Sequence, residues 1–160
     1  METTLIKKSV FTFEADICID DVIATASGGC YQILFSDIDT HAFMLALDVD
    51  GSGNVSFKTW NSLNAGTIVN LGVNAKAGEW FTLKIVYDPI SETEATITAY
   101  VNGEYVGESD SFYNKTEGKP VVTKINSISI YDRVAAECSL YIDNIKTSYD
   151  ATKYSTPAED

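Results

Sequence analysis

Hydrophobic and polar residues alternate with a period of two along most of this 160-residue chain. Successive side chains of a β-strand point to opposite faces, so this alternation predicts strands with one buried face and one exposed face. No segment of ten or more residues has a clean helical periodicity. The pattern predicts about nine or ten strands, the clearest of which lie at residues 9–19, 31–35, 43–49, 54–60, 78–88, 96–101, 128–130 and 139–149.

Turn-forming residues separate the predicted strands at intervals of about ten residues. Asn102-Gly103 is the strongest hairpin signal. Residues 61–77 are less regular, and only Ile68-Val69 indicates a short strand there. Many short strands joined by turns predict an all-β fold, a two-sheet antiparallel sandwich of the jelly-roll type. We expect residues 1–149 to form this single domain and residues 150–160 to form a polar linker or tail.

The composition excludes several classes of protein. Hydrophobic residues make up 45% of the chain, which is typical of a globular protein and excludes disorder. Eleven basic residues against 23 acidic ones give a net charge of −12, which repels nucleic acid and anionic membranes. No apolar run is long enough to cross a bilayer, so we expect no membrane insertion.

The first residues and the cysteines bear on where the protein acts. Leu5-Ile6-Lys7-Lys8 has no long apolar stretch beside it, so we read no secretion signal in these residues. We nevertheless expect an extracellular or cell-surface domain of a larger, multidomain bacterial protein. The cysteines are Cys18, Cys30 and Cys138. Cys18 and Cys138 would lie close together if the first and last strands are neighbours. The sequence is therefore compatible with a disulfide between them and with free thiols.

Several segments together resemble one known family. They are the opening strand at residues 9–19, the strand start Gly78-Glu-Trp-Phe-Thr-Leu83, Ala99-Tyr-Val-Asn-Gly103 and the closing strand Leu140-Tyr-Ile-Asp-Asn-Ile-Lys146. The chain resembles concanavalin A-like lectin/glucanase and laminin-G-type domains over residues 5–149. The resemblance implies the sandwich fold and a role in handling carbohydrate. It also implies that Trp80 has a packing role and is not a sugar platform, and that Asp143 is a candidate ligand for a structural calcium ion.

Carbohydrate binding has its own candidate residues. Trp60 shares the polar side of its strand with Ser56 and Lys58, which places an aromatic surface beside hydrogen-bonding groups. Sugar rings stack on such aromatic surfaces while polar side chains bind their hydroxyl groups. If the strands share one sheet, a platform forms; otherwise Trp60 covers an edge or packs under a loop. The predicted platform residues are Trp60, Tyr100, Gln32, Lys58 and Lys84, with Asn61 and Asn64 from the following loop.

Acidic residues suggest two further chemistries. Glu14, Asp16 and Asp20 share one strand face and resemble the catalytic Glu-x-Asp-x-x-Glu of laminarinase-type hydrolases, but Asp20 replaces the acid/base Glu with altered spacing.

The run from Asp48 to Phe57 is similar to an EF-hand calcium loop, but position twelve is Thr59 and the flanks alternate like strands. A hairpin turn explains the same residues.

The leading hypothesis is therefore a non-catalytic carbohydrate-binding module that binds a polysaccharide or other glycan. A structural or adhesion spacer is the alternative from another class. A small glycoside hydrolase acting through Glu14 is the second alternative.

Overall fold

The computed structural model describes residues 6–8, 10–21, 29–38, 40–61, 68–133, 137–150 and 153–155. These residues form strands joined by turns and loops, and none of them forms a helix that is long and apolar enough to cross a membrane. The strands are β1 (Ile6–Lys8), β2 (Phe11–Ile19), β3 (Gly29–Asp37), β4 (Thr40–Val49), β5 (Asn54–Trp60), β6 (Ile68–Lys76), β7 (Phe81–Pro89), β8 (Ala95–Val101), β9 (Glu104–Ser109), β10 (Ser127–Asp132), β11 (Leu140–Tyr149) and β12 (Lys153–Ser155).

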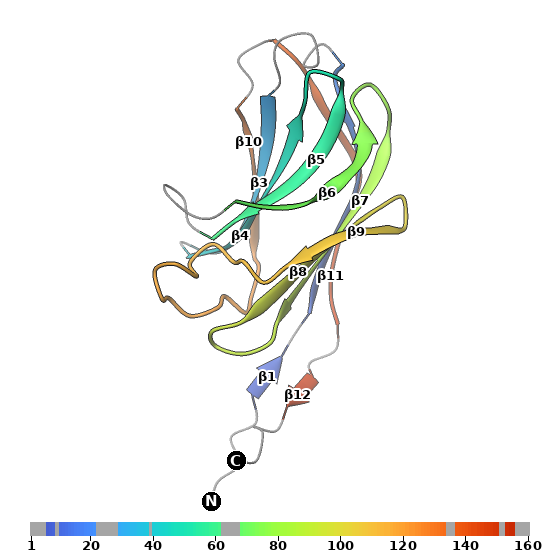
Figure 1. Ribbon diagram of the computed structural model, residues 1–160. Helices are drawn as coiled ribbons and strands as arrows, with labels where there is room; N and C mark the ends of the chain where they lie inside the picture. Colours follow the sequence, from blue (N-terminus) through green and yellow to red (C-terminus); the bar gives the residue numbers. More distant parts are fainter. Residues whose placement is uncertain are drawn as a thin grey trace, which may run out of the picture.

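Two five-stranded antiparallel sheets face each other (Figure 1). One has the order β10-β3-β4-β5-β6 and is called the β4 sheet; the other has the order β11-β2-β7-β8-β9 and is called the β7 sheet. The first and last long strands, β2 and β11, are paired neighbours. The predicted two-sheet sandwich is therefore confirmed. Three residues of the predicted tail form β12, which pairs with β1 beside the sandwich (Figure 1).

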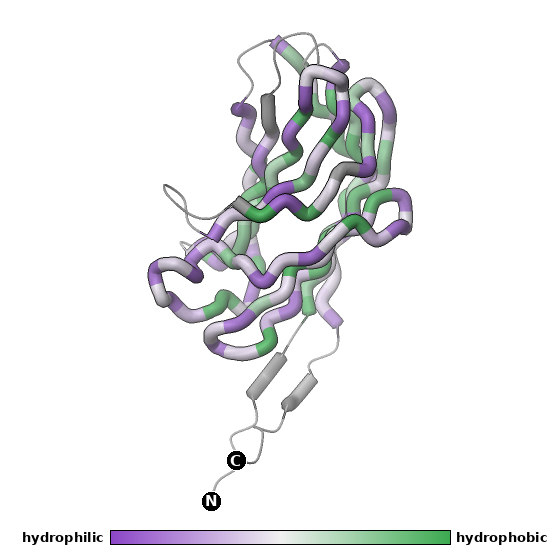
Figure 2. Tube along the Cα trace, in the orientation of Figure 1, coloured by the Kyte–Doolittle hydropathy of each residue, from purple (hydrophilic) through white to green (hydrophobic). Residues whose placement is uncertain are grey.

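The alternation along the strands builds the core between the two sheets. Figure 2 shows hydrophobic and hydrophilic residues following one another along the strands. β7 and β8 alternate strictly between buried and half-buried side chains. Stacked rings join the layers, because Phe43 of the β4 sheet lies 4.2 Å from Phe35 and 4.9 Å from Tyr87 of the β7 sheet, measured between ring centroids. Burial of these rings supplies a large hydrophobic stabilisation.

Residues 61–77 differ from the prediction, because β6 extends over nine residues. Its pairing with β5 shifts register between Val55 and Ser56 and again between Phe57 and Lys58. A β-bulge places an extra residue in one strand, so the inward and outward phases change along it. Because the phase changes at these bulges, the alternation of hydrophobic and polar residues does not predict the full length of β6.

The sandwich closes where edge strand β6 meets edge strand β9. A Cβ atom on Gly107 would lie 1.9 Å from the backbone oxygen of Leu71, and one on Gly72 would lie 2.6 Å from a methyl carbon of Val106. Only a residue without a side chain allows two backbones to approach this closely. The two glycines thus bring the two sheets together at this edge.

The segment at residues 110–126 contains no strand but completes the core. Phe112, Val121, Val122 and Ile125 are buried against the two sheets. The buried Tyr87 hydroxyl donates a hydrogen bond to the carbonyl oxygen of Val122 at 2.7 Å. This segment therefore holds a fixed position across one end of the sandwich.

Candidate functional site

Of the seven residues predicted to bind carbohydrate, the structure describes six, and five of these lie on two different sheets. Gln32, Lys58 and Trp60 belong to β3 and β5 of the β4 sheet, and Asn61 directly follows β5. Lys84 and Tyr100 belong to β7 and β8 of the β7 sheet. A single platform requires that these strands share one sheet, and they do not. Asn64 lies outside the described residues.

Trp60 packs on the outer side of the β4 sheet instead of standing free. It is half-buried against a small apolar cluster formed by Leu34, Met44 and Tyr113, each of which is less than 10% exposed. Tyr113 reaches this face from the segment at residues 110–126, where its amide donates a hydrogen bond to the Ala42 carbonyl at 3.1 Å. The alternative in which this face packs under a loop is therefore the one observed.

Two predicted polar platform residues of this sheet are already engaged with protein groups. The Lys58 ammonium forms an ion pair with the carboxylate of Asp48. The Gln32 side-chain oxygen accepts a hydrogen bond from Nε of Arg133 at 3.3 Å. The outer face of the β4 sheet is consequently a paired and partly covered surface.

The outer face of the β7 sheet carries a first exposed aromatic pair. Trp80 immediately precedes β7, and Tyr141 lies opposite Cys18 in the pairing of β11 with β2. The two ring centroids lie 6.5 Å apart, and the side chains are 56% and 53% exposed. The expected packing role of Trp80 does not fit its exposure, because its side chain is in phase with the outward Thr82 and Lys84. Large aromatic side chains left this exposed are candidates for binding.

A polar row crosses the strands next to this aromatic pair. Asp16 lies opposite Asp143 on β11 and opposite Thr82 on β7. Its two carboxylate oxygens accept hydrogen bonds from the Thr82 hydroxyl at 2.6 Å and from the Asn144 side-chain amide at 2.7 Å. These two bonds lower the pKa of Asp16. The carboxylate is therefore fixed in place and ionised.

A second aromatic pair lies on the far side of the same face. The rings of Tyr100 and Tyr105 meet edge to face with centroids 6.1 Å apart, and Tyr105 is 58% exposed. The Lys84 ammonium lies 5.5 Å from the centroid of the Tyr100 ring, within the range of a cation–π interaction. Lys84 thus presents an ordered positive charge beside an aromatic surface.

A shallow hollow of about 500 Å³ lies on this face. Glu14, Lys84 and Lys146 contribute its charged groups, and the Lys146 ammonium lies 4.0 Å from a Glu14 carboxylate oxygen. We call the whole surface the aromatic face; it comprises Trp80, Tyr141, Tyr100 and Tyr105 together with the polar side chains of Glu14, Asp16, Thr82, Lys84 and Lys146 on the same side of the sheet. It offers flat apolar rings at two places and hydrogen-bonding groups beside them.

Asp143, the expected calcium ligand, is bonded to the protein itself in the described part of the chain. One Asp143 carboxylate oxygen accepts a hydrogen bond from the backbone amide of Asn144 at 2.7 Å, and Asp16 is bonded as described above. Calcium takes six to eight oxygen ligands, several of them usually carboxylates. Among the residues that the structure places, no group of three or more His, Cys, Asp or Glu side chains could hold a metal ion.

The loop at Asp50 is a hairpin turn between β4 and β5. One Asp50 carboxylate oxygen accepts hydrogen bonds from the backbone amides of Ser52 and Asn54, and the other accepts one from the Asn54 side chain. These bonds lower the pKa of Asp50, the Asn54 side chain being the largest cause. Gly53 adopts a positive φ of 78°. The acidic residue therefore serves the turn, as the alternation of its flanks indicates.

Cys18 and Cys138 are both free thiols. Cys18 lies on the outer side of β2 beneath the Trp80–Tyr141 row, and its burial raises the pKa of its thiol. Cys138 packs against the core, where its sulfur lies 2.9 Å from the Tyr31 hydroxyl. The two thiols occupy opposite faces of the β7 sheet, so the disulfide alternative is not formed.

Comparisons with known proteins agree with this architecture. The sequence profile of the concanavalin A-like lectin/glucanases superfamily matches residues 4–142. No curated protein matches the chain in sequence.

Solved structures with a similar fold include three proteins of 10–12% sequence identity. They are the alginate lyase Aly36B (10% identity, TM-score 0.54, 88% of this chain and 69% of that one), the Caenorhabditis elegans galectin LEC-6 (12%, 0.53, 92% and 91%) and a SAP-like pentraxin from Limulus polyphemus (10%, 0.50, 92% and 71%). Identities this low show that the fold is shared, and no more than the fold.

Proposed function

The chain belongs to the concanavalin A-like lectin/glucanase superfamily, and within that fold we propose that it is a non-catalytic carbohydrate-binding domain whose aromatic face holds a polysaccharide. The proposal includes a place in a larger extracellular protein, where such a domain would bring its host to a glycan surface. A galectin and an alginate lyase among the proteins of similar fold favour this class of ligand.

Three exposed aromatic side chains on one sheet face, with the half-buried Tyr100 beside Tyr105, carry the proposal. The side chains of Trp80, Tyr141 and Tyr105 are each more than half exposed. Contact between apolar rings and water is energetically unfavourable. Sugar rings present apolar C–H faces that would cover these rings, while hydroxyl groups reach the polar row beside them. Asp16 and Lys84 are held in place by neighbouring side chains, so little conformational freedom would be lost on binding.

The charge of the chain favours a neutral polysaccharide. The net charge is −12, Glu14 and Asp16 contribute negative charge to the aromatic face, and Asp143 lies opposite Asp16 on the neighbouring strand. Lys146 lies beside Glu14, and Lys84 lies over the Tyr100 ring. A polymer with a carboxylate on every sugar would meet net repulsion as it approached this surface.

The carboxylates of this face support binding better than hydrolysis. A general acid for glycosidic cleavage needs a raised pKa, whereas the Thr82 and Asn144 side chains lower that of Asp16. Asp20 lies beyond the end of β2, where its amide bonds the carbonyl of Ser139 at 2.9 Å. These features favour binding over hydrolysis in the proposed role.

Affinity electrophoresis against a panel of neutral plant and microbial polysaccharides tests the proposal. Wild type should be retarded by at least one polymer, and Trp80→Ala should weaken that binding at least tenfold, or about 1.4 kcal/mol. Trp60→Phe is the matched control on the other sheet and should bind like wild type.

Three results would count against the proposal. Loss of binding in Trp60→Phe but not in Trp80→Ala would move the site to the β4 sheet. No retardation of wild type by any polymer would favour a structural or adhesion spacer. Cleavage of a bound polymer that disappears in Glu14→Gln would favour the hydrolase.

A further inference from the structure

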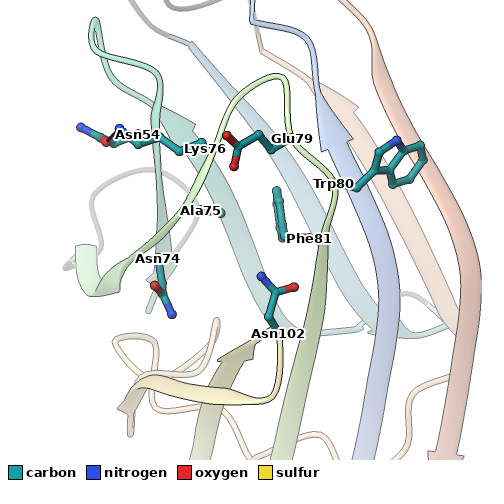
Figure 3. A pocket seen from close by; sticks show the side chains of 8 residues that line it. All are labelled: Asn54, Asn74, Ala75, Lys76, Glu79, Trp80, Phe81 and Asn102. Carbon is teal, nitrogen blue, oxygen red and sulfur yellow. Dashed lines mark hydrogen bonds between the residues drawn. The ribbon is translucent and has the colours of Figure 1, made fainter.

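A second recess, of about 330 Å³, opens next to the aromatic face (Figure 3). Its walls come from both sheets, because β6 belongs to the β4 sheet and β7 to the β7 sheet. We call it the rim hollow, and it is lined by Asn54, Asn74, Ala75, Lys76, Glu79, Trp80, Phe81 and Asn102. Figure 3 shows the side chains of Glu79, Phe81 and Asn102 directed into the space between β6 and β7.

Tight turns fix the walls of the rim hollow. Gly78, with φ of 83°, turns the chain from β6 into β7, and its amide bonds the Ile19 carbonyl at 2.6 Å. Asn102 lies in the β8–β9 hairpin, where its side-chain oxygen accepts a hydrogen bond from the Thr82 amide at 2.9 Å. The Lys76 ammonium donates to the Asn54 side-chain oxygen at 2.5 Å. The hollow is therefore formed in the unbound protein.

The lining combines an apolar floor with amide and carboxylate groups. Phe81 is only 4% exposed and forms the floor. The Asn74 amide and the Glu79 carboxylate stand at the walls, and both side chains are exposed to solvent. Neighbouring sugar hydroxyls both donate and accept hydrogen bonds, so a carboxylate and amides placed around an aromatic floor match them. The volume lies at the low end of the range of about 300–1,000 Å³ for ligand sites, which suits a single sugar and its linkage.

Trp80 connects the rim hollow to the aromatic face. Successive residues of an extended chain point to opposite sides, so Glu79 and Phe81 turn into the hollow while the Trp80 ring turns toward Tyr141. A glycan stacked on Trp80 would thus have its next sugar at the mouth of the hollow.

From this juxtaposition we infer that the rim hollow binds the terminal sugar of a neutral glycan whose adjoining sugars stack on Trp80. The inference rests on the proposed function and makes it more specific: the domain recognises chain ends. Glu79 disfavours a terminal sugar that carries a carboxylate, because the two negative charges would repel each other. A neutral hexose with free neighbouring hydroxyls is the expected ligand group.

Nuclear magnetic resonance titration with free glucose, galactose and mannose tests the hollow by itself. At least one hexose should shift the side-chain amide signals of Asn74 and Asn102 in a saturable way. Glu79→Ala should weaken this binding at least tenfold. Glu92→Ala, which removes an exposed carboxylate outside the hollow, is the matched control and should bind like wild type.

The outcomes separate the hollow from the aromatic face. Trp80→Ala removes the stacking surface and should lose polysaccharide binding, whereas Glu79→Ala keeps that surface and should weaken the hexose shifts. Absence of saturable shifts with all three hexoses, or equal behaviour of Glu79→Ala and Glu92→Ala, would overturn the inference and leave polysaccharide binding by Trp80 as a separate result. Hexose binding with no effect of Trp80→Ala on polymer would refute the aromatic face instead.

Discussion

Replacing Gly107 by alanine should destabilise the sandwich at the edge where β6 meets β9. The added Cβ would lie 1.9 Å from the Leu71 oxygen and 2.8 Å from its carbonyl carbon, whereas ordinary contact begins at 3.4 Å. The strands would have to separate by about 1.5 Å, and backbone atoms in a packed interior yield poorly. Overpacking typically costs about 1–3 kcal/mol, and we expect the upper part of that range here because a backbone atom blocks the space.

Thermal unfolding followed by circular dichroism measures this effect. For a domain of this size, about 3 kcal/mol corresponds to a decrease in melting temperature of about 6–12 °C. Gly51→Ala is the matched control, because no atom lies within 4 Å of the position that its Cβ would take and its φ is not positive. That variant should melt at or slightly above the wild-type temperature. A Gly107→Ala protein that melts within about 2 °C of wild type would refute the reasoning.

Three further predictions concern stability. Ile38→Asn should raise the melting temperature by about 2–8 °C, because Ile38 is exposed with φ of 49° and relief of that strain contributes about 1–2 kcal/mol; an unchanged or lower value would contradict this. Tyr87→Phe leaves the Val122 carbonyl without its hydroxyl donor and should cost about 1–3 kcal/mol in urea unfolding, and a loss below about 0.5 kcal/mol would count against it. The pKa of Asp16 is lower in the folded protein than the ordinary value of 3.8, so the ionised carboxylate stabilises the fold above pH 3.8, and this stability is lost as the pH falls through the folded-state pKa. The melting temperature of Asp16→Asn should therefore depend less steeply on pH below pH 4. Identical pH dependence of wild type and variant in that range would exclude this contribution.

The alternation of residues is sufficient to predict the fold, because a period of two is a local property of each strand. Phe81, Leu83 and Ile85 point inward as expected, and Asn102-Gly103 forms the predicted turn with φ of 51° and 82°. Most of β6 escapes the prediction, because two bulges change the phase there. The need for glycine at position 107 also cannot be predicted from the sequence, because it arises from a contact with Leu71, which belongs to the other sheet.

The site is less predictable than the fold, because alternation assigns a side chain to one side of its strand but not to a sheet. Tyr100 and Lys84 do lie together, as their opposite positions on β8 and β7 require. Trp60 points outward as predicted, yet Tyr113, far along the chain, partly covers it. Trp80 also has an outward phase, whereas the family resemblance implies a packing role. The phase predicts the observed exposure of Trp80 better than the resemblance does.

The difference between the two outer faces is the strongest reason to place a ligand on the β7 sheet. Leu34 and Met44 on the outside of the β4 sheet are covered, being 7% and 4% exposed beneath Tyr113 and Trp60, whereas Tyr131 on edge strand β10 of that sheet is 43% exposed. The chain thus has a segment that shields outward apolar groups on one sheet. On the other sheet, Trp80 and Tyr141 remain more than half exposed, and apolar surface in water opposes folding stability and solubility. Aromatic residues that the fold leaves uncovered beside ordered carboxylates and lysines are better explained by a ligand that covers them than by packing.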